Sequence, residues 1–324
     1  MRCTSAPKFP GGRHEVRTKA LLQQFLRAHT TLELQPCGEG FYAAHREENA
    51  PKPAIALRAD YDALATLDGG AAHLCGHDGH AASLCAVGLM LEGKSVGRNV
   101  FLLFQPAEET FEGSKNMIEH GILENPKVDA ALAYHVSPGQ MPVGIYMYNS
   151  TGTMMYSVDG FHIEIKGKGA HGAYPQNSVD PINIAAHVYF ALQSVIARET
   201  DPSKACLMTV GKFQAGTAAN IIPDTAVLEG TIRTNDKDSR ELLVRRMKET
   251  AIRTAETFGG TAKITMISEV PPLICNPEFT EQIVGFMKEL DIPKLTPYPG
   301  ISASASEDFA NIAEQVPSAF MYLS

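Results

Sequence analysis

The side chains best suited to metal binding fall into three short clusters along this chain. In sequence order these are Cys75, His77, Asp78 and His80, then Glu108 and Glu109, and finally His135. A thiolate, imidazoles and carboxylates make a mixed ligand set suited to zinc, with manganese, cobalt and nickel as alternatives. Two adjacent glutamates also allow a division of labour, in which one coordinates the metal and the other takes a proton from bound water.

Each cluster has an ordinary explanation when it is taken alone. A single Cys-x-His is a weak metal signal, adjacent acids favour a helix start, and an isolated histidine is more often a satisfied core residue. Their positions argue for a common site. The two glutamates follow shortly after the apolar run 99–104, and His135 follows the apolar run 130–134. In an open parallel sheet, ligands gather outside the carboxyl ends of the strands.

The elements that position these clusters alternate between strand and helix. Hydrophobic periodicity predicts helices at 13–29, 78–93 and 114–121 and strands at 40–45, 54–59, 99–105 and 130–135. This order predicts an α/β domain with a mainly parallel sheet and helices on both faces.

The pattern changes near residue 157. Strands at 158–167, 206–213, 225–234 and 261–267 are predicted, with helices at about 180–198 and 238–258. Asp180-Pro181 is a typical helix start, and Gly259-Gly260 a typical stop. The order strand–helix–strand–strand–helix–strand is that of a ferredoxin-like fold. The sequence therefore predicts an inserted domain at 157–268, with 1–156 and 269–324 forming the metal-binding catalytic domain.

Composition excludes several classes of protein. The chain has 324 residues and a formal net charge of -8, without a clustered Lys/Arg stripe, which argues against nucleic-acid binding. No apolar run approaches the roughly 20 residues of a membrane span, and residues 1–12 lack the apolar core of a signal peptide. Six scattered cysteines fit a reducing compartment. The expectation is a cytoplasmic protein of two domains that binds neither membrane nor nucleic acid.

Several motifs, in order, resemble those of the metallo-amidohydrolases that include aminoacylases, hippurate hydrolases, N-acetyl-diaminopimelate deacetylases and auxin-conjugate hydrolases. The matching segments are Arg58–Leu64, Cys75–His80, Gln105–Glu109, Tyr134-His135, Gly167–Pro175, Gly216–Asp224, Gly230–Thr234 and Ser306–Phe309. The resemblance covers about residues 40–310. It implies hydrolysis of the amide bond of small N-acyl amino acids, with two divalent ions (Zn, Mn, Co or Ni) in the complete site.

The resemblance also implies roles for individual residues of the metal site. The metal ligands fall on Cys75, His77, Glu109 and His135. Glu108 becomes the general base that activates metal-bound water and later protonates the departing amine. The acid that orients a ligand is Asp60, while Asp62, Asp78 and His80 are weaker candidates for the same site.

Three further residues lie in the predicted inserted domain. His171 resembles the histidine that stabilises the developing oxyanion, and Asn220 and Arg233 resemble the groups that hold the substrate carboxylate. An arginine fork suits a carboxylate in bidentate geometry. The resemblance also implies that the inserted domain acts as a lid and forms the interface of a homodimer.

The sequence departs from this pattern at both ends. Pro10–Glu15 differs from the start of the relatives, which also continue past the position of Ser324 into a segment with a fifth ligand, a histidine, and a closing helix. Residues 310–324 contain no His or Cys. Three interpretations stay open: a truncated family member, which we favour, an active variant, and a homologue that binds metal or ligand without turnover. A dipeptidase is a further alternative among enzymes.

Overall fold

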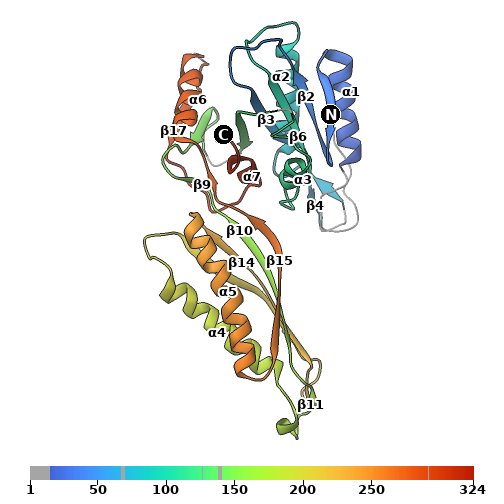
Figure 1. Ribbon diagram of the computed structural model, residues 1–324, viewed down its shortest axis with the longest axis vertical. Coiled ribbons are helices and arrows are strands. Elements are labelled where there is room, and N and C mark those ends of the chain that lie inside the picture. The colour runs from blue at the N-terminus through green and yellow to red at the C-terminus, as the bar shows by residue number, and fades with distance from the viewer. Residues whose placement is uncertain (1–14, 67–69, 126, 138–140, 291) are drawn as a thin grey trace. The chain divides into compact units, whose positions relative to one another are not determined.

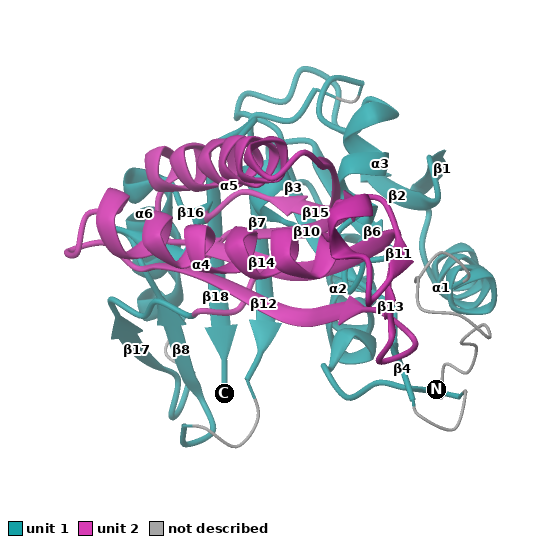
Figure 2. Ribbon diagram, turned by 90° about the horizontal axis from the view of Figure 1, so that it is seen from below, with its two compact units in different colours: residues 1–154, 273–303, 307–324 teal, residues 155–272, 304–306 magenta. Residues whose placement is uncertain are grey.

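Two units divide the chain in the computed structural model, which describes residues 15–66, 70–125, 127–137, 141–290 and 292–324. Unit 1 extends to Met154 and includes Leu273–Ala303 and Glu307–Ser324, whereas unit 2 contains Met155–Pro272 and Ser304–Ser306. Figure 2 colours unit 1 teal and unit 2 magenta. The predicted domain bounds, 1–156 with 269–324 and 157–268, stay a prediction. Cys3 and residues 10–14 lie outside the described residues.

An eight-stranded sheet in the order β1-β2-β6-β3-β7-β18-β8-β17 forms the centre of unit 1. Its strands are β1 (Glu33–Cys37), β2 (Gly40–His45), β6 (Val100–Gln105), β3 (Ile55–Asp60), β7 (Ala130–Val136), β18 (Ser318–Leu323), β8 (Ile145–Tyr148) and β17 (Thr296–Pro299). The central strands β6, β3, β7 and β18 run parallel to one another, as do β8 and β17. The other three pairs are antiparallel. This mainly parallel sheet with its helices confirms the predicted α/β class.

Helices α1 (Val16–His29) and α2 (His77–Leu91) lie beside β2, β3 and β6 in Figure 1. Their apolar side chains form one core with the sheet, in which Leu26, Leu84, Leu102 and Phe104 are buried. Unit 1 also contains the helices α3 (Gly113–Glu119), α6 (Pro277–Glu289) and α7 (Ala310–Ala313). The start of α6 is capped by the Asn276 side chain, which accepts from the N–H of Phe279. The sequence predicts that residues 271–324 return to the first domain, but it predicts no helix there.

Unit 2 has the predicted ferredoxin-like order of β10 (Val158–Lys166), α4 (Pro181–Glu199), β12 (Cys206–Ala215), β14 (Thr225–Thr234), α5 (Lys237–Thr257) and β15 (Thr261–Val270). The antiparallel sheet has the order β12-β14-β10-β15. Alternate residues of β10, Phe161 and Ile163 among them, pack against Leu192 of α4 and Met247 of α5. Asp180 caps α4 by accepting from the N–H of Ile182, as its place before a proline predicts.

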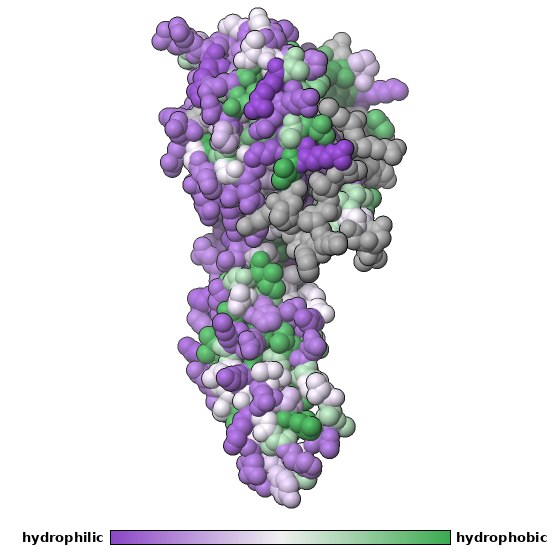
Figure 3. Space-filling view, turned by 90° about the vertical axis from the view of Figure 1, so that its right-hand side faces the viewer, coloured by the Kyte–Doolittle hydropathy of each residue, from purple (hydrophilic) through white to green (hydrophobic). Residues whose placement is uncertain are grey.

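Short elements complete the two units. They are β4 (Leu64–Ala65), β5 (Ala71–Ala72), β9 (Thr153–Met155), β11 (Ala170–His171), the 3₁₀ turn Pro175–Asn177, β13 (Ile221–Ile222) and β16 (Leu273–Ile274). In the described part of the chain, no helix combines the length and apolarity needed to cross a membrane. On the face that Figure 3 shows, hydrophilic residues predominate and hydrophobic ones are dispersed among them.

Candidate functional site

The predicted metal ligands gather near the carboxyl-terminal ends of β6 and β7 and at the start of α2, within unit 1. Ligand atoms of Cys75, His77 and His135 all lie within 4.8 Å of one another, and so do those of His77, Glu108 and Glu109. Since His77 belongs to both groups, the structure brings the three sequence clusters together around its imidazole. Strand ends that share one edge of a parallel sheet are expected to do this.

Glycine is required between the first two ligands. Gly76 precedes α2 with φ 90, in the left-handed region that side chains with a Cβ rarely adopt. A Cβ at this position would also collide with Cγ2 of Val136, the last residue of β7. The sharp turn at Gly76 therefore lets Cys75 and His77 approach the end of the strand that carries His135.

Two buried polar atoms of this group have no hydrogen-bond partner among the described residues. They are Nε2 of His77 and Oε1 of Glu109, which lie 3.9 Å apart. Two atoms that each bind zinc at about 2.0–2.2 Å would lie on the order of 3–4 Å apart. Because orphaned buried polar atoms are rare, each needs an explanation. The spacing and the donor types fit a divalent cation between them.

The carboxylate of Asp62 orients both of these side chains. Its Oδ1 lies 2.9 Å from Nδ1 of His77, and its Oδ2 accepts a hydrogen bond of 3.0 Å from the backbone N–H of Glu109. A carboxylate only accepts, so the Nδ1–H of His77 donates to it and Nε2 points into the site. Such a carboxylate–histidine pair is the usual support of a metal-bound imidazole.

The protonation of His77 responds to its neighbours. Burial lowers its pKa, but the hydrogen bond to Asp62, the contact with Cys75 and the charges of Asp60 and Asp62 outweigh burial and raise the pKa to about 12. A cation that binds Nε2 must therefore displace a proton. At His135 burial also acts to lower the pKa, but here it is the dominant cause, so the pKa falls below its usual value and the neutral ring is favoured.

His80 and His135 differ in whether a ring nitrogen is left to face the site. Nδ1 of His80 donates to Asp60 Oδ1 at 2.6 Å, and its Nε2 accepts from the backbone N–H of Val136 at 2.9 Å. Both nitrogens are occupied, which makes His80 a brace for the end of β7 rather than a ligand in this arrangement. In contrast, His135 donates through Nδ1 to the carbonyl of Val136 at 2.6 Å, leaving Nε2 for the site.

Asp60, predicted to orient a ligand, makes its hydrogen bonds to His80 and to Arg58. It lies 3.8 Å from Nε2 of His77, whereas the ring of His77 donates its hydrogen bond to Asp62. Burial works against the charge of Asp60, but Arg58 and then the histidines hold its pKa below the usual range. The role predicted for Asp60 stays a prediction, and the geometry adds Asp62 as a residue with that contact.

A tight turn presents Glu108 and Glu109 to the site. Ala107 has φ 54 in the left-handed region, and its carbonyl accepts from the N–H groups of Glu112 and Gly113 at 3.2 and 3.1 Å. A non-glycine residue in this conformation is uncommon and is found at strained functional turns. The strained Ala107 residue directs the two following glutamates toward His77.

Glu108 is 6% exposed and adjoins further carboxyl groups. Its Oε1 accepts from the N–H of Asp308 at 3.4 Å, and its carboxyl group clusters with those of Glu307 and Asp308. Burial, followed by the charges of Glu307, Asp308 and Asp60, raises the pKa of Glu108 well above its ordinary value, and Arg58 opposes this. A carboxyl group with a raised pKa is suited to exchange protons near neutral pH.

The structure adds four residues that had no predicted role. Arg58, Gln105, Glu307 and Asp308 are buried and hydrogen-bonded to one another behind the predicted ligands. One signal was present, since a charged residue within an otherwise apolar strand such as 54–59 requires a buried partner. The identity of that partner could not be read from the sequence, because the partners are up to 250 residues away.

Unit 2 carries the three remaining predicted residues. His171 lies exposed on β11, which pairs with β13, and the N–H of Gly172 donates to the carbonyl of Asn220 at 2.8 Å. The structure thus places Asn220, which directly precedes β13, beside the strand that carries His171. Arg233 lies on β14, where its Nη1 donates to Ser306 Oγ at 2.7 Å and to the carbonyl of Ser304. The predicted roles of all three stay predictions.

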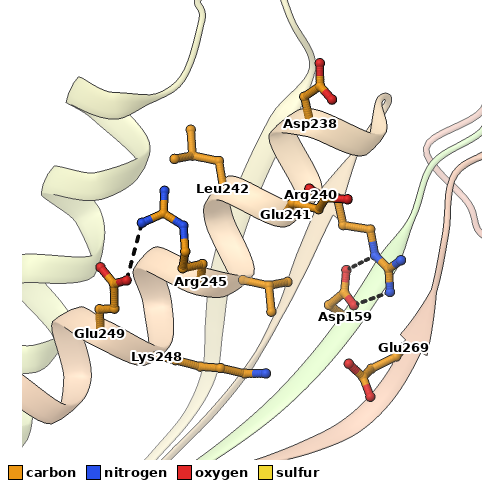
Figure 4. A pocket seen from close by; sticks show the side chains of 10 residues that line it. Asp159, Asp238, Arg240, Glu241, Leu242, Arg245, Lys248, Glu249 and Glu269 are labelled. Carbon is orange, nitrogen blue, oxygen red and sulfur yellow. Dashed lines mark hydrogen bonds and ion pairs between the residues drawn. The ribbon is translucent and has the colours of Figure 1, made fainter.

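Unit 2 also has an open groove of about 760 Å³ beside α5, shown in Figure 4. Its charges are mixed and pair within the groove, as in the ion pairs of Arg240 with Asp159 and of Arg245 with Glu249. A cavity of about 310 Å³ in unit 1 is lined mainly by apolar side chains of α2, α6 and the sheet. Neither cavity contains the predicted ligands, so the metal-binding group remains the best candidate site.

Comparison with known proteins identifies the family to which this chain belongs. Residues 56–324 match the sequence profile of the peptidase family M20/M25/M40. The chain is 38% identical over 283 residues to an N-acetyl-L-cysteine deacetylase of Bacillus subtilis (strain 168), covering 83% of this chain and 66% of that protein. It is 32% identical over 325 residues to a hippurate hydrolase of Campylobacter jejuni, covering 96% of this chain and 84% of the hydrolase.

A solved structure extends the agreement to the fold. It is that of a Bacillus subtilis protein described as a dinuclear metal-binding peptidase of family M20. The two structures superpose with a TM-score of 0.77 at 28% identity, covering 98% of this chain and 84% of the other. These matches confirm the resemblance inferred from the sequence motifs, and the chain belongs to peptidase family M20/M25/M40.

Proposed function

We propose that this protein is a metal-dependent amidohydrolase that cleaves the amide bond of small N-acyl amino acids. The observation that carries the proposal is the pair of orphaned buried atoms, His77 Nε2 and Glu109 Oε1, with the Glu108 carboxyl group beside them. The deacetylase and hippurate hydrolase named above, both hydrolases of N-acyl amino acids by name, support the substrate class.

Cys75, His77, Glu109 and His135 are the residues that would hold the metal. A bound divalent cation would polarise the amide carbonyl and make water more acidic. The thiolate favours zinc, with manganese, cobalt and nickel as alternatives, and the dinuclear relative supports two ions per site.

Glu108 is proposed to take a proton from the attacking water and to deliver it to the amine nitrogen as the amide bond breaks. Its raised pKa suits both halves of this transfer, because the group must hold a proton between the two steps. His171 is proposed to donate a hydrogen bond to the developing oxyanion. Asn220 and Arg233 are proposed to hold the substrate carboxylate, since Arg233 already donates to oxygen acceptors.

We further propose a homodimer formed through residues 157–268 and a cytoplasmic location. The location is supported by Cys37, Cys75, Cys85, Cys206 and Cys275, which are free thiols as a reducing compartment requires.

The test is a Glu108→Gln variant assayed on N-acetyl and N-benzoyl amino acids and on dipeptides, with zinc, manganese, cobalt or nickel added. Glu119→Gln, an exposed glutamate of α3, is the matched control. We expect Glu108→Gln to lose about 10²–10⁴-fold in kcat while binding metal as before, because Glu108 is not among the four proposed ligands. Unchanged turnover in Glu108→Gln would refute the mechanism. If the wild type cleaved dipeptides faster than N-acyl amino acids, the substrate class would have to be reassigned. A wild type that binds metal but turns over neither substrate class would be a binding protein.

A further inference from the structure

Arg58 uses all of its hydrogen-bonding capacity inside unit 1. Its side chain is 1% exposed. Nε donates to Gln105 Oε1 at 2.8 Å, and Nη1 donates to Asp60 Oδ2 at 2.8 Å and to Glu307 Oε2 at 3.4 Å. Nη2 donates to Glu307 Oε1 and to Asp308 Oδ1, both at 2.8 Å. A guanidinium group has five N–H donors, and all five have an acceptor here.

Two of these acceptors, Asp60 and Asp308, connect Arg58 to the candidate metal site. Asp60, beyond its bond to Arg58, holds His80, which in turn accepts from the N–H of Val136 beside His135. Asp308 places its own N–H on the Glu108 carboxyl group.

A second set of contacts makes this cluster rigid. Both carboxylate oxygens of Asp308 accept from Nε2 of Gln105, at 2.7 and 2.9 Å, and Oδ2 also accepts from the N–H of Ser114. Glu307 Oε1 accepts from the N–H of Phe309 at 3.0 Å. The carboxylates at 307 and 308 are therefore held in one orientation, with the Arg58 guanidinium at their centre.

We propose that Arg58 is a positioning residue of the active site, which ties the ends of β3 and β6 to the Glu307–Asp308 turn and so fixes both Glu108 and the brace behind His135. This inference rests on the proposed function for its kinetic consequences but not for its metal-binding ones. Lysine cannot serve all of these acceptors, since its ammonium group has three donors in tetrahedral geometry whereas the guanidinium group has five in a planar fork.

The test substitutes Arg58→Lys, which keeps the charge and removes the fork. Arg240→Lys is the matched control, because Arg240 makes a bidentate pair with the buried Asp159 in unit 2, shown in Figure 4. The metal-free proteins are titrated with Co²⁺ in competition with a chromophoric chelator. The cobalt-loaded proteins are then assayed for kcat and KM on an N-acetyl amino acid.

We expect Arg58→Lys to weaken Co²⁺ binding about tenfold and to lower kcat about 100-fold with KM changed less than threefold. Arg240→Lys should leave Co²⁺ affinity and kcat unchanged. An Arg58→Lys protein with wild-type circular dichroism, Co²⁺ affinity and kcat would overturn the proposal, as would equal losses in the Arg240→Lys control. If no acyl amino acid is hydrolysed even by the wild type, the proposed function fails but the Co²⁺ titration still decides the role of Arg58.

Asp308→Asn provides a second variant if Arg58→Lys does not fold. It keeps the shape of the side chain and removes one charged acceptor of Arg58. We expect it to weaken Co²⁺ binding in the same direction, and the double variant to lose less than the sum of the two single losses, because both remove one shared interaction. Wild-type Co²⁺ affinity in Asp308→Asn, or strictly additive losses in the double variant, would contradict the proposal.

Discussion

Replacing Asp62 by asparagine tests the assignment of His77 as a metal ligand. Asp62 is 1% exposed, and its two oxygens accept from Nδ1 of His77 and from the N–H of Glu109. Asparagine keeps only one acceptor oxygen, so one of these donors must face an NH₂ group. If the amide oxygen stays on Glu109, the NH₂ group donates to Nδ1 of His77, and the ring proton moves to Nε2, the nitrogen that faces the site.

The magnitude follows from two opposing effects. Removal of a carboxylate that orients a metal-bound histidine typically weakens metal binding by about 10–100-fold. The charge of Asp62 also helps to raise the pKa of His77 to about 12, so its loss makes the proton easier to displace and offsets part of the penalty. We therefore expect the lower end, about a tenfold increase in the metal dissociation constant, equal to about 1.4 kcal/mol.

The assay is a Co²⁺ titration of the metal-free protein, followed through the visible absorption of the cobalt–thiolate contact expected at Cys75. Asp78→Asn is the control, since Asp78 is an exposed acid in the first turn of the same helix. An Asp62→Asn variant that binds Co²⁺ with wild-type affinity would refute the assignment of His77 Nε2 as a ligand. A loss of equal size in Asp78→Asn would show that net charge, rather than orientation of the ring, explains the effect.

Three further predictions concern the supporting structure. Gly76→Ala, at φ 90 and against Val136, should lower the free energy of unfolding in urea by more than about 1 kcal/mol, and adding Val136→Ala should restore part of the loss. The Glu47 carboxyl accepts from the N–H of Val96 and from neighbouring donors, which hold its pKa at about 2. Because the pKa is lower in the folded state, Glu47 stabilises the fold fully above about pH 4.3 and progressively less as the pH falls toward 2. The difference in unfolding free energy between wild type and Glu47→Gln should therefore shrink over this range. If Glu47 makes no such hydrogen bonds in solution, urea unfolding would show no pH-dependent difference between wild type and Glu47→Gln. Leu192→Ala, in the core of unit 2, should cost about 2–5 kcal/mol, and a loss below 1 kcal/mol in urea unfolding would mean that α4 is not packed as described.

The fold was predictable where local patterns are strong. Alternation along 158–167 and the Asp180-Pro181 cap are read directly from neighbouring residues, and β10 and α4 form there. Short elements such as β8 and β17 were not predicted, because four residues carry too little periodicity to distinguish a strand from a loop. Their place in the sheet depends on pairing with residues far away in the sequence, as Thr296 pairs with Ile145.

The residues of the candidate site were likewise predictable only in part. The residues that face the cation site were predicted because metal ligands must be of a few chemical types and must follow strand ends. The residues behind them, such as Arg58, Gln105 and Asp308, were assigned no role, since they are ordinary polar residues until their partners are known. Hydrogen-bond partners are a property of tertiary structure, and the ligand types alone do not specify them.

The charged cluster around Arg58 is built from segments that lie far apart in the sequence. Arg58 is placed in an apolar strand and would be costly to bury alone. Its carboxylate partners Glu307 and Asp308 arrive only when the chain has passed through unit 2 and returned to unit 1. Burial of the guanidinium therefore depends on that return. Since Asp308 also contacts Glu108, the proposed base acquires its observed environment only after both parts of unit 1 have come together.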